Sequence, residues 1–83
     1  MVSETLTVYT TSWCGYCTRL KRVLDREAIS YREVNIELDE DATRFVMSVN
    51  DGNQTVPTVT FRNGAVLTNP SLAEVKRNLA RAS

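Results

Sequence analysis

The spacing of hydrophobic and polar positions predicts a strand, a helix and a second strand in the first half of the chain. Residues 6–10 alternate with a period of two and are rich in β-branched side chains, as strands are. In residues 16–28 apolar positions recur three or four apart among charged ones, which predicts an amphipathic helix, and residues 30–36 return to alternation. The helix would turn Cys17, Leu20, Leu24 and Ala28 inward.

The second half of the chain predicts another helix followed by a hairpin. Three acidic residues, 39–41, suit the electropositive first turn of a helix that residues 50–53 end. Strands at 58–61 and 65–68 flank Asn63-Gly64, a pair that favours a tight turn in which both residues have positive φ. The inward stripe of the helix is Ala42, Phe45, Val46 and Val49.

A last helix is expected to begin near Pro70, whose fixed φ suits a first helical turn. Ser71 and Glu74 have the spacing of a capping box, and Leu72, Val75 and Leu79 form the buried stripe. The order β-α-β-α-β-β-α requires a parallel first pair of strands, with a right-handed crossover, and an antiparallel hairpin. We therefore expect an α/β protein: a single domain over residues 1–83 with a minimal thioredoxin fold, in which three helices flank a four-stranded mixed sheet.

Composition narrows the class of function. Ten basic and ten acidic side chains cancel and histidine is absent, so a net charge of zero offers no long-range attraction to nucleic acid or anionic lipid. No stretch approaches the roughly 18–20 apolar residues of a membrane span. Residues 1–5 lack the features of a secretory signal, which predicts a cytoplasmic protein, expected as a monomer. In that reducing compartment a disulfide persists only where it takes part in chemistry.

The only two cysteines, Cys14 and Cys17, form one Cys-x-x-Cys motif between the first strand and the first helix. Unpaired N–H groups and the helix dipole favour an anion at Cys14, and the thiolate is the nucleophilic form of cysteine. A cysteine so placed can have a pKa of about 3.5–7.5, against about 8.5 when free. Cys17 is in phase with the buried stripe, so we expect an exposed attacking thiol at Cys14 and a sheltered resolving thiol at Cys17.

Two structural interpretations compete with redox chemistry at this motif. A zinc site needs four ligands, which two cysteines without histidine do not supply, so no metal site is predicted. Two inert core cysteines are the other alternative, because free cysteine is often a small buried hydrophobe. The strand–Cys-x-x-Cys–helix context favours redox chemistry over both.

Residues 55–57 (Thr-Val-Pro) are the second informative segment. Pro57 could simply begin a strand, where its missing N–H costs nothing. Alternatively, a cis peptide bond at Pro57 would pack beside the cysteines and leave the backbone of Val56 free to pair with a substrate like an added strand.

The residues that flank the motif also have two interpretations each. Trp13 and Tyr16 are either core aromatics or an apolar rim around the Cys14 sulfur. Arg19, with Lys21 and Arg22, belongs to a solvated helix face, although Arg19 or Arg22 could add positive potential near Cys14.

The chain resembles the glutaredoxin family over essentially its whole length, and within that family the actinobacterial mycoredoxins. The resemblance rests on residues 13–17 (Trp-Cys-Gly-Tyr-Cys), on residues 55–57 and on the order of the elements. Supporting stretches are residues 9–12, 48–53 and 67–71.

This resemblance implies a thiol–disulfide oxidoreductase that reduces mixed disulfides between proteins and mycothiol, a small thiol used in place of glutathione. By analogy, Cys14 attacks the mixed disulfide, a second mycothiol frees Cys14, and Cys17 can instead close on Cys14. The implied partners are mycothiol, mycothiolated proteins such as peroxidases and other thiol enzymes, and a mycothiol disulfide reductase that uses NADPH. No tightly bound cofactor is implied.

The chain departs from glutathione-using glutaredoxins at two places. A lysine that holds a glutathione carboxylate is replaced by the segment Thr11-Ser12-Trp13, and a Gly-Gly-acidic segment is replaced by residues 68–71. Mycothiol has a sugar–inositol body without the two free carboxylates of glutathione, so neutral groups suit it better than cations. The expected thiol-binding residues are Trp13, Tyr16, Thr55, Val56, Pro57, Thr68 and Asn69.

Two other functions stay open. A general disulfide reductase or electron donor of the redoxin type would be served by a flavin reductase, but the chain lacks a Trp-Ser-Gly-Phe type of docking segment and the Cys-Gly-Pro-Cys motif of thioredoxins. An iron–sulfur scaffold or carrier would hold a cluster between two chains through Cys14 and two small thiols. Gly15, in place of a proline common in reductases, keeps that alternative open.

Overall fold

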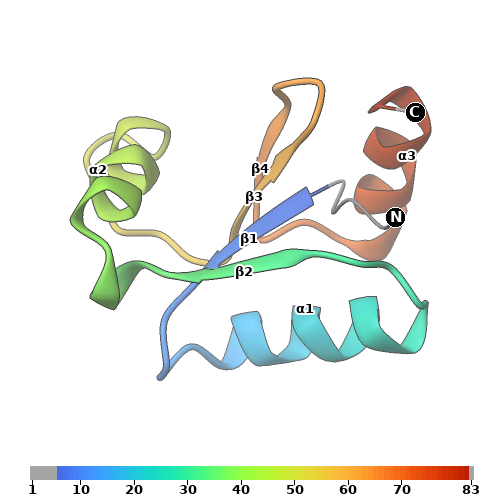
Figure 1. Cartoon of the computed structure of the whole chain (residues 1–83), viewed down its shortest axis with the longest axis horizontal. Coiled ribbons are helices and arrows are strands. Elements are labelled where there is room, and N and C mark those ends of the chain that lie inside the picture. Colours follow the sequence, from blue (N-terminus) through green and yellow to red (C-terminus); the bar gives the residue numbers. More distant parts are fainter. Residues whose placement is uncertain (1–5, 83) are drawn as a thin grey trace.

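The computed structural model describes residues 6–82 and contains the seven predicted elements in the predicted order, with one short addition (Figure 1). Residues 1–5, where the sequence predicts no secretory signal, lie outside the described residues. The strands are β1 (Leu6–Thr10), β2 (Arg32–Asn35), β3 (Thr58–Phe61) and β4 (Val66–Thr68). The helices are α1 (Gly15–Arg26), α2 (Glu40–Ser48) and α3 (Leu72–Ala82), and a 3₁₀ turn, η1, spans Ile36–Leu38.

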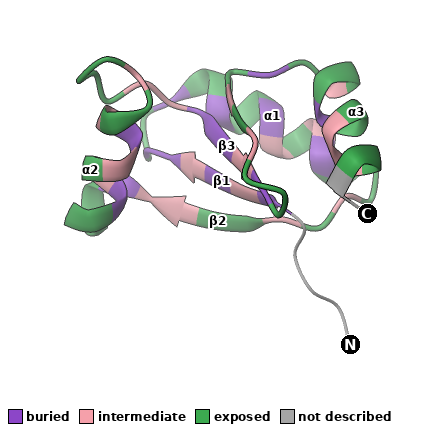
Figure 2. Ribbon diagram, turned by 90° about the horizontal axis from the view of Figure 1, so that it is seen from above, coloured by how far each residue is buried: buried purple, intermediate pink, exposed green. Residues whose placement is uncertain are grey.

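The sheet has the order β2-β1-β3-β4, with β1 parallel to β2 and the other two pairs antiparallel. Helices α1 and α3 cover one face and α2 covers the other, so the expected mixed sheet flanked by three helices is confirmed (Figure 2). Between residues 6 and 82, none of the helices has the length and apolarity that a bilayer crossing requires.

Two hydrophobic clusters hold these layers together. Side chains of β1 and β3 alternate between the faces, so Leu6 and Val8 meet α1 and α3, while Tyr9 packs toward α2. Tyr9 and Phe45 of α2 form an aromatic contact with ring centroids 5.2 Å apart. The larger cluster consists of Leu6, Val8, Leu20, Leu24, Val59, Phe61 and Val75, and the smaller of Ile36, Ala42 and Val46.

Helix α1 ends at Arg26, so the expectation that Ala28 faces inward from this helix is wrong. Ala28 is exposed and has a φ of 56°, in the left-handed region. Its N–H donates to the Asp25 carbonyl at 3.1 Å, and the Ile29 N–H donates to the Leu24 carbonyl at 2.9 Å. This is a Schellman cap, which ends the helix two residues before the apolar pattern does.

The second predicted strand and the second predicted stripe are also shorter than expected. The strand ends at Asn35 because the Asn35 side chain accepts a hydrogen bond from the Glu37 N–H at 2.9 Å and starts η1. Val49, predicted to face inward, is the C-cap of α2 and is exposed, because the helix has already ended at Ser48.

The hairpin and the last helix begin differently from the prediction. Only Gly64 of the Asn63-Gly64 pair has positive φ (92°), because the turn has three residues, 62–64, between Phe61 and Ala65, which are joined by a hydrogen bond from Phe61 N–H to Ala65 O at 2.9 Å. Pro70 lies before the helix rather than in its first turn. Helix α3 begins at Leu72, after a capping box in which Ser71 N–H donates to Glu74 (2.9 Å) and Glu74 N–H donates to the Ser71 hydroxyl (3.2 Å).

Candidate active site

Cys14 is the N-cap residue of α1. Its backbone is extended, with φ −88° and ψ 110°, and its Sγ accepts a hydrogen bond from the Cys17 N–H at 3.1 Å. Helix α1 has no acidic residue in its first turn, so the sulfur occupies the place that an acidic side chain takes in many helices. This geometry stabilises negative charge on the Cys14 sulfur once the pair is reduced.

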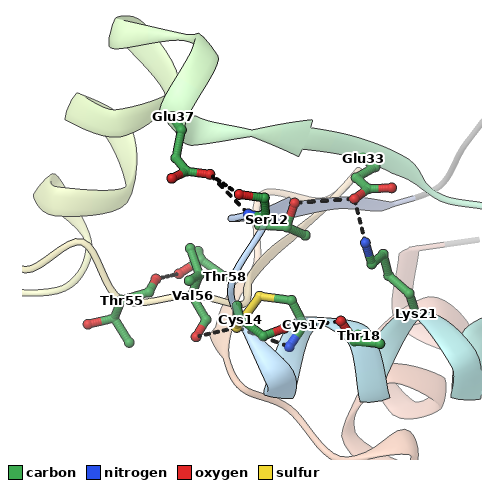
Figure 3. The surroundings of a disulfide bond; sticks show 11 residues. Ser12, Cys14, Cys17, Thr18, Lys21, Glu33, Glu37, Thr55, Val56 and Thr58 are labelled. Carbon is green, nitrogen blue, oxygen red and sulfur yellow. Dashed lines mark hydrogen bonds and ion pairs between the residues drawn. A yellow bond between two sulfur atoms is a disulfide. The ribbon is translucent and has the colours of Figure 1, made fainter.

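The two cysteines form a disulfide, with Cα atoms 5.2 Å apart (Figure 3). Cys17 is fully buried, as predicted. Cys14 was expected to be exposed, and that expectation is wrong for this oxidised pair, because only 6% of the residue is accessible. The carbonyl oxygen of Val56 lies 3.7 Å from the Cys14 sulfur and shields one side of it. The two cysteines still differ in exposure, because Cys14 keeps a small accessible area and Cys17 has none.

The Val56–Pro57 peptide bond is cis, as the second interpretation of this segment predicted. Pro57 is buried beside the motif, and the Val56 carbonyl points toward the Cys14 sulfur (Figure 3). Within residues 6–82 the Val56 N–H makes no hydrogen bond. A free backbone donor therefore lies next to the reactive sulfur, where an extended substrate backbone can pair with it.

Trp13 and Tyr16 are surface residues, with exposed fractions of 73% and 62%. The interpretation of either one as a core aromatic is therefore wrong, and both are exposed next to Cys14 in the chain. Tyr16 and Asn69 line one groove of about 350 Å³ between α1 and the start of α3. Its other lining residues are Arg19, Leu20, Val23, Pro70, Ser71, Leu72 and Glu74.

Thr68 and Asn69, both expected to bind the small thiol, make different contacts in the structure. The Thr68 hydroxyl donates to Asn50 Oδ1 at 2.8 Å, so it is already engaged within the protein. Asn69 has a φ of 46°, and its N–H donates to the Pro57 carbonyl at 2.8 Å. Asn69 thereby ties the start of α3 to the cis-proline.

Asn50, which the sequence suggested only as a helix stop, links three segments around the site. Its Nδ2 donates to the Val46 carbonyl at 2.8 Å and to the Thr58 hydroxyl at 3.1 Å, while its Oδ1 accepts from Thr68. The Thr58 hydroxyl in turn donates to the Thr55 carbonyl at 2.8 Å. The network therefore fixes the loop that carries the cis-proline.

Glu37, another residue missed at the sequence level, fixes the loop on the other side of Cys14. One carboxylate oxygen accepts from the Ser12 N–H at 3.0 Å and from the Ser12 hydroxyl at 2.8 Å (Figure 3). These hydrogen bonds lower the pKa of Glu37, with smaller contributions in the same direction from the side chains of Trp13 and Asn35. No pattern in the sequence predicts a contact between Ser12 and Glu37, which are 25 positions apart, so it is found only in the folded structure.

The arrangement suits thiol–disulfide exchange: a sulfur at a helix N-terminus, a partner sulfur one turn away and an open backbone donor beside them. Of the two cations singled out from the sequence, Arg19 lines the groove with Tyr16, and Arg22 lies one turn further along α1. In the part of the chain that the structure describes, no three His, Cys, Asp or Glu side chains gather as a metal site would require.

Comparison with known proteins agrees with this geometry. The glutaredoxin family model matches residues 6–66. A Mycobacterium tuberculosis protein assigned as a glutaredoxin is 57% identical over 81 residues, which is 98% of this chain and 96% of the relative. Mycoredoxin 1 of Corynebacterium glutamicum is 46% identical over 70 residues, or 84% of this chain and 86% of the relative.

Solved structures show the same fold. A buckwheat glutaredoxin in complex with glutathione superposes with a TM-score of 0.66 at 26% identity, covering 89% of this chain and 69% of that one. A thioredoxin-like protein superposes with a TM-score of 0.72 at 24% identity, covering 87% and 96%, which supports the predicted fold class. The chain therefore belongs to the glutaredoxin family of thiol–disulfide oxidoreductases, and the resemblance to mycoredoxins expected from its sequence is confirmed.

Proposed function

We propose that this protein reduces mixed disulfides between proteins and mycothiol, with Cys14 as the attacking thiolate. The observation that carries the proposal is the Cys14 sulfur at the N-cap of α1, 3.1 Å from the Cys17 N–H. The Cys14 thiolate attacks the mycothiol sulfur of the mixed disulfide, and the protein leaves as a thiolate that takes up a proton. The enzyme then carries a disulfide between Cys14 and mycothiol.

A second mycothiol thiolate completes the cycle. It attacks the mycothiol sulfur of the adduct, releases the Cys14 thiolate and leaves as oxidised mycothiol disulfide, which a reductase returns to the thiol with electrons from NADPH. Cys17 can instead attack Cys14, which releases mycothiol and forms the disulfide seen in the structure. The exchange needs no tightly bound cofactor, because the sulfur–sulfur bonds themselves carry both electrons.

The charge on the loop that precedes Cys14 supports mycothiol over glutathione. Glutathione-using relatives place a lysine two or three positions before the first cysteine, where this chain has Thr11 and Ser12. The Thr11 side chain is buried, and Ser12 is hydrogen-bonded to the Glu37 carboxylate. An anion therefore lies where those relatives present a cation, which disfavours the free carboxylates of glutathione and is compatible with a neutral sugar–inositol body.

The groove that contains Tyr16 and Asn69 is the site that we assign to that sugar–inositol body. Its wall combines the exposed Tyr16 ring with polar groups of Arg19 and Asn69, a mixture that suits hydroxyl-rich ligands. Thr68 is left out of this assignment, because its hydroxyl already donates to Asn50. We assign the Thr55–Pro57 loop and Trp13 to the chain that carries the mixed disulfide.

The test compares one peptide carrying either a mycothiol or a glutathione mixed disulfide. The proposal predicts that kcat/KM is about tenfold or more higher for the mycothiol form. In the Glu37→Gln variant the carboxamide oxygen can still accept from Ser12 but the charge is gone, so the glutathione rate should rise while the mycothiol rate holds. Equal turnover of both forms by the native protein would contradict the proposal.

We further propose that the active protein is a cytoplasmic monomer with one domain over residues 1–83.

A further inference from the structure

Three arginines of α1 form a stripe on its solvent face, beginning one turn after Cys14. Arg19, Arg22 and Arg26 follow one another at spacings of three and four residues, which places them on one side of a helix. That side is opposite to the face that buries Leu20 and Leu24. The arginines line a shallow depression of about 440 Å³ together with Gly15, Thr18 and Val23.

The stripe carries positive charge that the rest of the described chain does not neutralise. The other charged side chains of α1 and its C-cap each have a partner, whereas the three arginines form no ion pair with any residue between 6 and 82. Lys21 forms an ion pair with Glu33 at 2.6 Å and Glu27 forms one with Lys76 at 2.9 Å, while Asp25 interacts with the uncharged hydroxyl of Tyr31.

The charges of α1 differ from those of the other two helices, which have acidic residues in their first turn. Helix α2 has Glu40 and Asp41 in its first turn and α3 has Glu74, but α1 has no acidic residue there. Like charges three and four residues apart destabilise an isolated helix, and of the three arginines only Arg26, in the last turn of α1, is placed where the helix dipole favours a cation. A pattern that costs stability beside the reactive sulfur points to a role in binding.

Negative charge gathers on the other side of the sheet. Four of the ten acidic residues of this neutral chain lie between positions 37 and 41, in η1 and the start of α2. Helix α2 covers the sheet face opposite to α1 and α3 (Figure 2). The molecule is therefore polarised across the sheet, with Cys14 at the start of its positive side, and this field orients a charged partner as it approaches.

We propose that the arginine stripe of α1 is a docking surface for proteins whose disulfide is flanked by acidic residues. This inference rests on the proposed function only in that Cys14 is the attacking sulfur, and it does not depend on the identity of the small thiol. The acidic segment binds along the arginines of α1 while its disulfide reaches Cys14. Proteins with basic residues next to their disulfide are repelled by the same positive charge.

The experiment uses two peptides of equal length that carry the same cysteine–thionitrobenzoate mixed disulfide, one flanked by glutamates and one by lysines. Attack by reduced Cys14 releases coloured thionitrobenzoate, so the rate is measured without mycothiol or glutathione. We expect the glutamate peptide to react about tenfold faster at low ionic strength. The ratio should fall toward one in about 1 M salt, where charges are screened within a few ångströms.

Two double variants separate docking from net charge. In Arg22→Glu with Arg26→Glu, the preference should reverse, while reaction with neutral hydroxyethyl disulfide stays unchanged. The control, Arg77→Glu with Arg81→Glu on α3, changes the net charge equally and should keep the preference for the glutamate peptide. Equal rates for the two native reactions, or the same loss of preference in both double variants, would overturn the docking surface. A native protein that prefers the glutamate peptide but does not discriminate mycothiol from glutathione would overturn the proposed thiol instead.

Discussion

Glu37 and Ser12 are joined by two hydrogen bonds to one carboxylate oxygen, at 3.0 Å from the Ser12 N–H and 2.8 Å from the Ser12 hydroxyl. Glu37 lies in η1, and Ser12 lies in the loop between β1 and α1, two residues before Cys14. The link anchors the loop that carries Trp13 to η1, which directly follows β2, the strand next to β1. The position of the exposed Trp13 side chain therefore depends on the charge of a residue outside the Cys-x-x-Cys motif.

The first prediction concerns the pH at which this link weakens. Because hydrogen bonds from Ser12 lower the pKa of Glu37 below its ordinary 4.5, the charge-assisted link is at full strength above that pH and weakens as the pH falls through the lowered pKa, since a neutral carboxyl is a poorer acceptor. Trp13 is the only tryptophan, so its emission reports the change directly. The emission should change only below pH 4.5 in native protein and should stay flat in the matched variant Glu37→Gln. A transition of native protein centred above that value would contradict this role of Glu37.

The second prediction concerns Asn50, which holds the cis-proline loop through Thr58 and β4 through Thr68. Asn50→Ala removes three hydrogen bonds and should lower the free energy of unfolding by about 1–3 kcal/mol. It should also slow disulfide exchange, because the loop beside Cys14 loosens. Asn53→Ala is the control, since the Asn53 side chain makes one exposed hydrogen bond in the same turn. If the Asn50 variant and the control lose equal stability, measured by urea unfolding, the network does not fix the loop.

The third prediction uses the left-handed cap of α1. Ala28 has a φ of 56°, where the Cβ atom costs about 1 kcal/mol and glycine has no such cost. Ala28→Gly should therefore raise the free energy of unfolding by about 1 kcal/mol, and Ala28→Asn should fall between the two. Denaturant unfolding gives the order directly. A destabilising glycine would mean that the cap is not left-handed in solution.

The fourth prediction separates the two cysteines. In the proposed cycle only Cys14 bonds to mycothiol, so Cys17→Ser should retain most of the activity on mycothiol mixed disulfides. It should also accumulate a mass-detectable adduct with mycothiol. Cys14→Ser should lose both the activity and the adduct, since Cys17 is fully buried. Complete loss of activity in Cys17→Ser would instead require a route through the Cys14–Cys17 disulfide.

The order of elements and the sheet could be predicted because each depends on local patterns: the period of Leu6 and Val8 in β1, or the three- and four-residue spacing of Cys17, Leu20 and Leu24 in α1. Element ends could not, because they depend on single hydrogen bonds. The Asn35 side chain ends β2 before Ile36, and the Schellman cap ends α1 before Ala28. Ile36 and Ala28 both fit the apolar pattern of the element that stops short of them.

Of the candidate site, too, part could be predicted from the sequence and part could not. The placement of Cys14 at a helix N-terminus follows from its position between a predicted strand and a predicted helix, and the burial of Cys17 follows from its spacing to Leu20 and Leu24. The links from Glu37 to Ser12 and from Asn50 to Thr68 join residues 25 and 18 positions apart, and no spacing rule identifies such pairs. They exist because the sheet brings distant loops to the same edge.

The most direct test of this account is a pH titration of the reduced protein that follows thiolate formation, combined with mass-spectrometric identification of the cysteine alkylated first. The account predicts that Cys14 reacts first and that its pKa lies in the range of about 3.5–7.5 found for cysteines at helix N-termini. A value near that of free cysteine, about 8.5, or alkylation of Cys17 before Cys14, would contradict it.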